Sequence, residues 1–427
     1  MPRRKRSVLR REIASIIAPG RIVELARELQ VVKRQRKVDI VSLVAALTLG
    51  LSGGGQRTIA LLRRAYECST GQSLAPSAFY GRLTAGLALL LKTLVEEAMA
   101  QLEARSPALR GSLARFKQVL IADGSLLRLH DGLARQFPSV WSHYMKASAK
   151  LHVVINVSGR SAQSIQLTRG SRQDVRILKV GKWVSGKLLI FDLAYTKGLL
   201  FQRIQQHGGF FLIRKKATPD AKIIAGPPHL IGRYLSEIRS ELAGDVLDLQ
   251  IKVPWYFDRG PNKKVRHELL VRLVGSWHAD EKRYRFYVTN APPELLAAKH
   301  AAAIYAARWE VELFFRELKL QYRIEDLPTR KRGVAECLIY AALLASLVSR
   351  RLRQALFSSN HLPAIERWAR VFATFALEML NLLIGGPRHA SRAEHRLLRT
   401  LKREAIDPNK KRLPLAERAR SGLLAGS

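Results

Sequence analysis

Cysteine is nearly absent from this sequence of 427 residues. Its two cysteines, Cys68 and Cys337, stand far apart in the chain. Such spacing excludes a disulfide framework and a cysteine-rich metal site, and it is typical of a protein that works in a reducing cytoplasm.

Acidic residues are scarce as well. The chain has 34 Asp and Glu against 73 Lys and Arg, which gives a formal net charge of +39. An excess of this size repels itself unless the working partner is a polyanion, and nucleic acid is the usual one. The charge therefore favours a nucleic-acid partner over a membrane surface or an acidic protein, but it does not distinguish cutting, copying or coating.

Long apolar runs and a nucleotide-binding loop are also missing. The longest apolar runs, such as "LIYAALLASLVS" from Leu338, are shorter than the ~20 residues that cross a bilayer. No G-x-x-x-x-G-K-[ST] motif occurs, and the Gly-rich "LGLSGGGQRT" lacks the preceding strand that a phosphate-binding loop needs. The sequence thus gives no support for a membrane protein or an ATP-driven enzyme.

What is present begins with a helical region at residues 1–112. Four segments show helical apolar spacing, at 21–30, 38–51, 54–69 and 77–104. A basic helical region in front of another domain favours DNA recognition of a helix-turn-helix kind. The alternative is a helical cap with solvated arginines. The basic runs "MPRRKR" and "VVKRQRKV" are predicted to be flexible phosphate-binding arms.

The pattern changes to α/β at residues 113–332. Three strand-like runs are followed by helix, strand, helix and strand, which predicts a mixed sheet that begins antiparallel and continues through a crossover. Residues 218–293 are rich in strand patterns and are predicted to be an insertion with its own small sheet. Residues 333–427 are expected to form two further helices and, from Pro387, a basic tail that is mobile or draped on DNA.

Two aspartates end apolar runs in the α/β region. Asp123 follows "VLIA" and is read as part of an Asp-Gly turn, and Asp192 follows "KLLIF". Carboxylates at the ends of neighbouring strands meet at the edge where open α/β sheets bind ligands. A third carboxylate from a helix across this edge would complete an oxygen cage for Mg²⁺ or Mn²⁺. Each aspartate alone also fits an ordinary turn.

A helix predicted from about residue 293 to beyond residue 319 carries a polar stripe. At about 100° per residue, its members fall within an arc of about 60°, with Arg316 just beside them; they are Tyr305, Arg308, Glu312 and Lys319. Apolar residues border the stripe on both sides, which predicts a helix seated in a core with its stripe facing a cleft. The alternative is an ion-pair ladder of Arg308, Glu312 and Arg316.

This combination resembles the DDE transposases of the insertion-sequence family four, whose signature is Y-x2-R-x3-E-x6-K. The stripe meets the signature in full, and "LIADGS" and "LLIFDLAY" resemble the two Asp-bearing strands of that family. The resemblance covers residues 116–330 and implies an RNase H-like fold with a β-rich insertion before the Glu-bearing helix. Helices would precede and follow this α/β domain.

The resemblance also implies the roles of individual residues. Asp123, Asp192 and Glu312 would be catalytic and would bind two Mg²⁺ or Mn²⁺ ions per site. DNA phosphates would be held by Tyr305, Arg308 and Lys319, with Arg316 as an ion-pair partner or an extra DNA contact. Trp255 and Trp277 are candidates for stacking on a displaced base, with core packing as the alternative for each.

The expected activity is metal-dependent cleavage at the ends of an insertion sequence and strand transfer into target DNA. Partners would be double-stranded DNA with terminal inverted repeats, target DNA and a second copy of the chain, in the bacterial cytoplasm at the nucleoid. The alternatives are a metal-dependent nuclease without strand transfer and a non-catalytic DNA-binding protein derived from a transposase.

Two other acidic residues, Asp131 and Asp174, lie near the predicted site. Asp174 is read as structural at a helix start.

Overall fold

The computed structural model describes residues 8–406, except for short gaps. These gaps are 33–37, 53–57, 107–108, 110, 141–142, 159–160, 217–218, 239–241, 243, 245, 259–263, 279–280, 328, 359–361 and 385–389. Most of the two predicted basic arms and the last part of the predicted tail lie outside the described residues.

Helices fill the amino-terminal region, as predicted. They are α1 Val8–Ile16, α2 Pro19–Glu28, α3 Ile40–Gly50, α4 Ile59–Thr70, α5 Pro76–Tyr80 and α6 Ala85–Glu103, followed by the 3₁₀ turn η1 Gly111–Arg115. The segment 77–104 forms two helices instead of one. A turn separates them because the Thr84 hydroxyl accepts a hydrogen bond from the Leu87 amide and starts α6 afresh.

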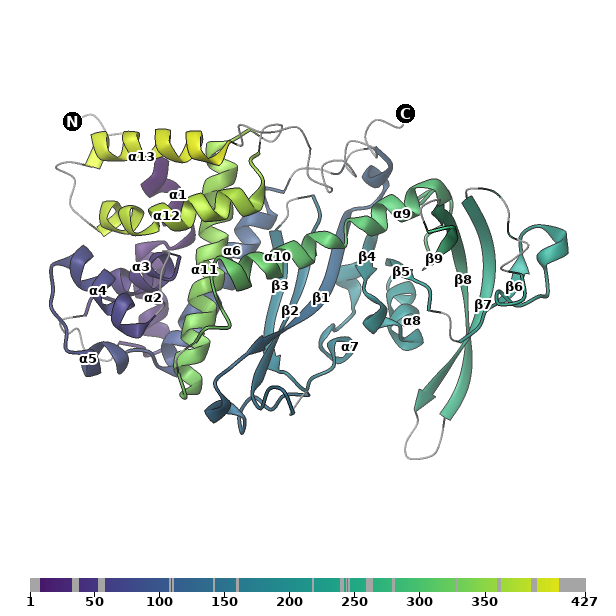
Figure 1. Cartoon of the computed structure of the whole chain (residues 1–427), viewed down its shortest axis with the longest axis horizontal. Coiled ribbons are helices and arrows are strands. Elements are labelled where there is room, and N and C mark those ends of the chain that lie inside the picture. Colours follow the sequence, from purple (N-terminus) through teal and green to yellow (C-terminus); the bar gives the residue numbers. More distant parts are fainter. Residues whose placement is uncertain are drawn as a thin grey trace.

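The carboxy-terminal helices pack against this region. They are α11 Arg332–Leu356, α12 Ile365–Ile384 and α13 Ala390–Ala405. Glu12 of α1 forms an ion pair with Arg351 of α11, and the amide of Leu9 donates to Glu394 of α13. Figure 1 shows the purple and yellow helices side by side at one end of the molecule. Both ends of the chain therefore build one helical body.

The helix α13 corrects the prediction of a mobile tail from Pro387. Its residues Leu397, Leu401 and Ala405 are buried in the core of the helical body. They lie four residues apart, so they share one face of a helix. The basic residues between them hid this narrow apolar stripe.

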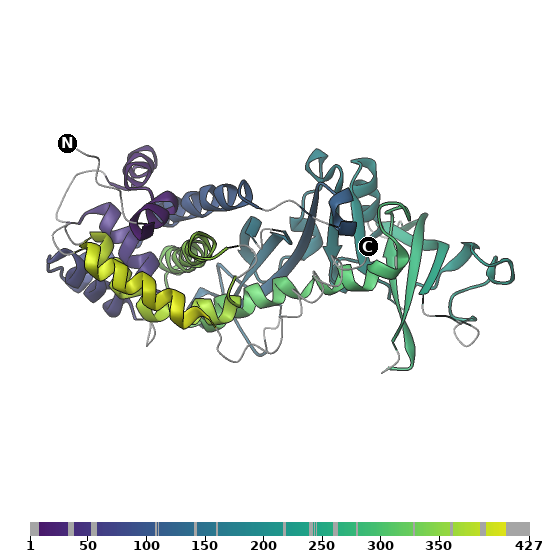
Figure 2. The ribbon, with the colours of Figure 1, turned by 90° about the horizontal axis from the view of Figure 1, so that it is seen from above.

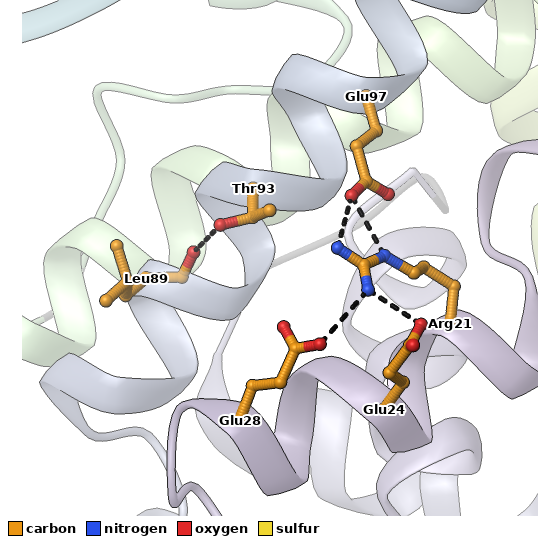
Figure 3. A network of polar contacts seen from close by, with 6 residues as sticks. All are labelled: Arg21, Glu24, Glu28, Leu89, Thr93 and Glu97. Atoms are coloured by element: carbon orange, nitrogen blue, oxygen red, sulfur yellow. Dashed lines mark hydrogen bonds and ion pairs between the residues drawn. The ribbon is translucent and has the colours of Figure 1, made fainter.

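An ion-pair cluster joins α2 to α6 within the helical body. Arg21 of α2 reaches Glu97 of α6 at 2.9 Å, and it also pairs with Glu24 at 2.7 Å and Glu28 at 3.5 Å. Figure 3 shows the three carboxylates around the single guanidinium. Arg21 is thus paired with acidic residues on the partly exposed surface between the two helices.

The α/β region forms the predicted mixed sheet. Its first strands are β1 Gln118–Arg128, β2 Ser148–Asn156, β3 Ser161–Arg169, β4 Lys187–Phe191 and β5 Phe210–Arg214. They lie in the order β3-β2-β1-β4-β5, with β1, β2 and β3 antiparallel and β1, β4 and β5 parallel. This order and these directions are those of an RNase H-like core, so the predicted fold class is confirmed.

Each face of the sheet has its own hydrophobic core. Val119 and Ile121 of β1 face the core formed with α6 and α11, whereas Leu120 and Ala122 face the opposite core. The opposite face carries α8 Gly198–Gln206, with the short α7 Asp174–Ile177 and the 3₁₀ turn η3 Lys182–Val184 nearby. The helix predicted before β4 is thus present only as two short helical turns.

The β-rich block extends the main sheet, which corrects the prediction of a separate small sheet. Its strands are β6 Lys222–Ala225, β7 Val246–Asp258, β8 Lys264–His278 and β9 Arg283–Thr289. Because β9 pairs antiparallel with β5, the described strands form one nine-stranded sheet. In Figure 1 these strands lie at the end of the molecule opposite the helical body.

The predicted stripe-bearing helix is interrupted. It forms α9 Ala298–Ala306 and α10 Trp309–Leu320. Between them, the amides of Ala307, Arg308, Glu310 and Val311 bond to carbonyls three residues back. Such bonds give three residues per turn, so the junction shifts Tyr305 around the axis relative to the residues of α10. Figure 2 shows α9 and α10 passing along one side of the sheet toward the helical body.

By length and composition, α11 is apolar enough to cross a membrane. However, 83% of its most apolar window is buried inside the protein. This burial identifies α11 as the central helix of the core.

Candidate functional site

The two predicted aspartates lie side by side on β1 and after β4. The parallel pairing of these strands ends with Ala122 opposite Phe191, and Asp123 and Asp192 are the next residues. Their alternation with Ile121 and Ile190 points both toward the face that carries α10. The sequence thus predicted their proximity.

The predicted Asp-Gly turn at residues 123–124 is wrong, because β1 continues to Arg128. Asp123 and Gly124 stay in the antiparallel ladder with β2, opposite Val153 and His152. The apolar run ends at Ala122 because β4, the parallel neighbour, stops there. A strand can therefore run on past the end of its hydrophobic segment.

The ionised form of the Asp123 carboxyl group is disfavoured in the folded protein. Burial and the nearby Asp192 carboxylate raise the pKa of Asp123 to about 6, while the Gly124 amide, at 2.7 Å from Oδ1, and Arg308 oppose the rise. Burial also raises the pKa of Tyr195, with Asp174, Asp123 and Asp192 adding to the rise. The site is thus short of positive charge, which is the condition that a bound cation relieves.

Glu312 of α10 is held by an arginine one turn away. Its carboxylate forms an ion pair of 2.5 Å with Arg308, which lies at the α9–α10 junction. The charge of Arg308 also acts on Asp123 and Asp192, so this guanidinium lies within electrostatic reach of all three acidic residues. Arg308 therefore links the helix to the sheet edge.

Tyr305 and Lys319 flank this pair. Burial raises the pKa of Tyr305 to about 12, so its hydroxyl keeps its proton at neutral pH. The Lys319 ammonium donates to the Leu126 carbonyl at 2.9 Å and pairs with Glu325 at 3.3 Å. One group is thus a neutral donor beside the carboxylates, and the other fastens α10 to β1.

The predicted Arg308–Glu312–Arg316 ladder forms only in its first half. Arg316 turns away and pairs with Glu366 of α12, and both side chains are about half exposed, at 48% each. The expected apolar borders also differ, because Val311, Phe315 and Leu318 are buried while Trp309 and Leu320 are exposed. The open border leaves one flank of the stripe accessible to solvent.

A buried polar network lies beneath Gly124 on the opposite face of the sheet. Asp174 pairs with His152 at 2.9 Å and with Lys150 at 3.0 Å, and the His152 ring contacts Thr168 at 2.9 Å. The structural role predicted for Asp174 fits these contacts. The sequence around His152 alternates like that of any strand and gives no sign of this network.

The other candidates differ in position. Asp131 is exposed in a 3₁₀ turn, η2 Asp131–Leu133, after β1. Trp277 is 40% exposed and forms an edge contact with Tyr284, so core packing is wrong for this residue. The side chain of Trp255 lies outside the described residues.

A cavity of about 430 Å³ near the ends of β4 and β5 is lined by both cationic and apolar residues. Its cationic lining residues are Lys197, Arg214, Lys215 and Lys216. The apolar lining residues Phe201, Ile213 and Val288 belong to the core on the face opposite Asp123, and of the four cationic residues Arg214 also acts electrostatically on Tyr305.

The carboxylate set fits a hard divalent cation in its chemistry. Asp123, Asp192 and Glu312 offer only oxygen ligands, which Mg²⁺ and Mn²⁺ prefer. Asp123 and Asp192 are already neighbours, whereas Glu312 is engaged with Arg308. Among the described residues, no three His, Cys, Asp or Glu side chains converge as a finished metal cage. Two carboxylates are thus already adjacent, whereas Glu312 could join them only by leaving Arg308.

The chain is similar to several known proteins. The family model described as "Transposase DDE domain" matches residues 114–348. The chain is similar to the transposase for insertion sequence element IS231F of Bacillus thuringiensis subsp. israelensis, at 22% identity over 78% of this chain and 77% of the relative. It is also similar to that of IS231C from subsp. berliner, at 20% identity over 91% and 93%. Among solved structures, a piggyBac transposase synaptic complex with hairpin DNA matches with a TM-score of 0.47 and 10% identity, over 94% of this chain and 86% of that one.

Proposed function

Because the chain belongs to the transposase DDE domain family, we propose that it cleaves DNA at the ends of its own insertion sequence and joins them to target DNA. The observation that supports this most directly is the pair Asp123 and Asp192 on neighbouring strands, facing the helix of Glu312. The assignment to insertion-sequence family four is part of the proposal and rests on the stripe of Tyr305, Arg308, Glu312 and Lys319.

Asp123, Asp192 and Glu312 would hold two Mg²⁺ or Mn²⁺ ions, since DDE transposases generally use divalent metals. Bound metal would supply activation of a water or a DNA 3′-hydroxyl and stabilisation of the leaving oxygen. Glu312 must release Arg308 to take part. Arg308 is then free to donate to a phosphate, so the partner exchange supplies a ligand and a DNA contact together.

The other polar residues of the stripe suit phosphate binding. The protonated Tyr305 hydroxyl can donate a hydrogen bond to a phosphate oxygen without adding negative charge. Lys319 is partly exposed at 31% and can supply a point charge, while Arg316 lies further out as an additional DNA contact. Arg214, which acts electrostatically on Tyr305, and the nearby Lys197 would extend this contact beyond the carboxylates.

The proposal extends to partners and domains. Residues 1–112 would recognise the terminal inverted repeats, residues 113–332 would perform the reaction, and residues 333–427 would brace both. Two copies of the chain would act on two element ends together. The protein would work in the bacterial cytoplasm and associate with the nucleoid when bound to DNA.

Incubation with element DNA and metal tests the proposal. A supercoiled plasmid carrying the gene with its flanking DNA should be cut near inverted repeats in Mg²⁺ or Mn²⁺ and not in EDTA. Precleaved ends from that plasmid should become joined to a second plasmid. Cutting without joining would identify a nuclease, and binding without cutting would identify a non-catalytic DNA-binding protein; either result would contradict the proposal.

A further inference from the structure

The helix α10 is short, and it carries functional residues on one side only. Its 12 residues lie between the tight junction at Ala307–Arg308 and a turn after Leu320. Isolated helices of this length are marginal in water, so packing must fix its position. Lys319 fastens it to β1 through the Leu126 carbonyl. The contacts on the opposite side of α10 therefore determine the direction of the Glu312 side chain.

A buried ion pair holds that other side to α11. Glu317 is 3% exposed and lies 2.5 Å from the guanidinium of Arg350, while its second oxygen accepts from the Ser346 hydroxyl at 3.3 Å. Arg350 also lies over the ring of Phe314, at 4.9 Å from its centroid. Burial raises the pKa of Glu317, and Arg350 opposes the rise. The contact therefore combines an ion pair, a hydrogen bond and a cation–π contact.

The preceding residue of α10 provides an exposed counterpart. Arg316 and Glu366 form an ion pair between α10 and α12 with both side chains about half exposed. Exposed pairs contribute little to stability, and water readily replaces them. A buried pair is different, because either partner left alone is strongly destabilising, whereas replacing both by apolar residues is often neutral. The buried pair is therefore better suited to fixing a geometry than to adding stability.

Arginines at the end of α11 connect several parts of the molecule. Arg350 binds α10, Arg351 pairs with Glu12 of α1, and Arg353 donates to the Pro363 carbonyl before α12 at 2.8 Å. These contacts place the last turns of α11 between the catalytic helix and the helical body. A displacement of the helical body would therefore be transmitted to α10 through the contact of Arg350 with Glu317.

We propose that the Glu317–Arg350 pair is a positioning contact that sets the rotation of α10, so that Glu312 can meet Asp123 and Asp192. Glu312 and Glu317 are five residues apart, or about 140° around the axis and about 7.5 Å along it. A rotation that loosens Glu317 therefore moves Glu312 with it. Misplacement of a reacting group by about 1 Å can lower a rate about 100-fold. The inference rests on the proposed function, because it takes Glu312 as a metal ligand.

Variants on both sides of the contact test this role. Glu317→Gln keeps the shape and removes the charge, and the double variant Glu317→Leu with Arg350→Met replaces the pair by apolar residues. Glu366→Gln breaks the exposed pair and serves as the matched control. For each protein, thermal unfolding is followed in EDTA, Mn²⁺ binding is measured by electron paramagnetic resonance, and nicking of the plasmid with flanking DNA is measured across Mg²⁺ concentrations.

The double variant is expected to unfold near the wild-type temperature, yet to nick DNA about 10–100-fold more slowly at saturating Mg²⁺. Both altered proteins should bind Mn²⁺ more weakly, and Glu366→Gln should match the wild type within about twofold. If Glu317→Gln fails to fold, the double variant decides. Wild-type nicking and Mn²⁺ binding in a folded double variant would overturn the inference. A wild-type protein that binds Mn²⁺ but cuts no DNA would instead overturn the proposed function, and the Mn²⁺ affinities would still decide the positioning role.

Discussion

Asp123→Asn is expected to abolish DNA cleavage and, at the same time, to make the metal-free protein harder to unfold at pH 8. The cleavage loss should exceed about 100-fold, since even the outer partners of metal ligands cost about 10–100-fold when removed. The stability gain follows from burial, which raises the pKa of Asp123 to about 6. The residue that we propose as a metal ligand is therefore one whose charged form folding disfavours.

The pH dependence of this gain can be stated in advance. Because the pKa of Asp123 rises from 3.8 to about 6 on folding, the folded protein binds more protons between these values. The free energy of unfolding then falls as the pH rises from about 4 to about 6, and it stays lower above that. A rise of about 2 in the pKa corresponds to at most about 3 kcal/mol in the free energy of unfolding, and solvent screening reduces this effect to about 1–3 kcal/mol. Asparagine carries no charge, so the variant should escape this loss.

Thermal unfolding in EDTA at pH 4 and pH 8 measures the effect. Asp123→Asn should unfold several degrees above the wild type at pH 8 and close to it at pH 4. Added Mg²⁺ should stabilise the wild type and leave the variant unchanged, because ligand binding stabilises only the form that binds. Asp131→Asn, on the exposed 3₁₀ turn, is the matched control and should change neither stability nor cleavage. Equal unfolding temperatures for Asp123→Asn and wild type at pH 8 would contradict the electrostatic argument.

The sheet and its two aspartates could be predicted because strands leave a local pattern. "VLIA" and the "LLIF" of residues 188–191 are apolar throughout since both faces of these strands are buried. The chain order of strands and helices then restricts the topology to few choices. The proximity of Asp123 and Asp192 follows from that order alone.

Features that depend on a distant partner could not be predicted. The extension of the sheet by β9 is set by its pairing with β5, and a hydrophobic pattern gives no information on which edge a strand joins. The junction between α9 and α10 has no Gly or Pro to mark it. Likewise, the segment "SRRLR" at residues 349–353 resembles a basic surface patch, yet Arg350 and Arg353 are buried. Their partners lie on other elements, so part of the net positive charge is committed to the fold.

Gly124→Ala is expected to destabilise the protein by about 2–4 kcal/mol, even though it adds a single methyl group to a strand. A Cβ at this position would lie 3.0 Å from the Asp174 Cγ and closer still to one carboxylate oxygen. Asp174 has little freedom to withdraw, because it is bound to both Lys150 and His152. The added methyl must therefore disturb either the ladder of β1 or a buried ion pair.

A double variant separates the steric cause from a general intolerance of β1. Asp174→Ala removes the obstructing carboxylate, so the cost of Gly124→Ala in that background should be clearly smaller than in the wild type. Gly20→Ala in α2 is the matched control: no atom lies within 4 Å of its Cβ, and alanine favours a helix by up to about 1 kcal/mol. Thermal and urea unfolding measure all four proteins. Equal costs of Gly124→Ala in both backgrounds would mean that the methyl group acts on the strand itself, not on Asp174. A smaller cost would show that the Asp174 network and the strand of Asp123 share one space, so the glycine after Asp123 is required by the opposite face of the sheet.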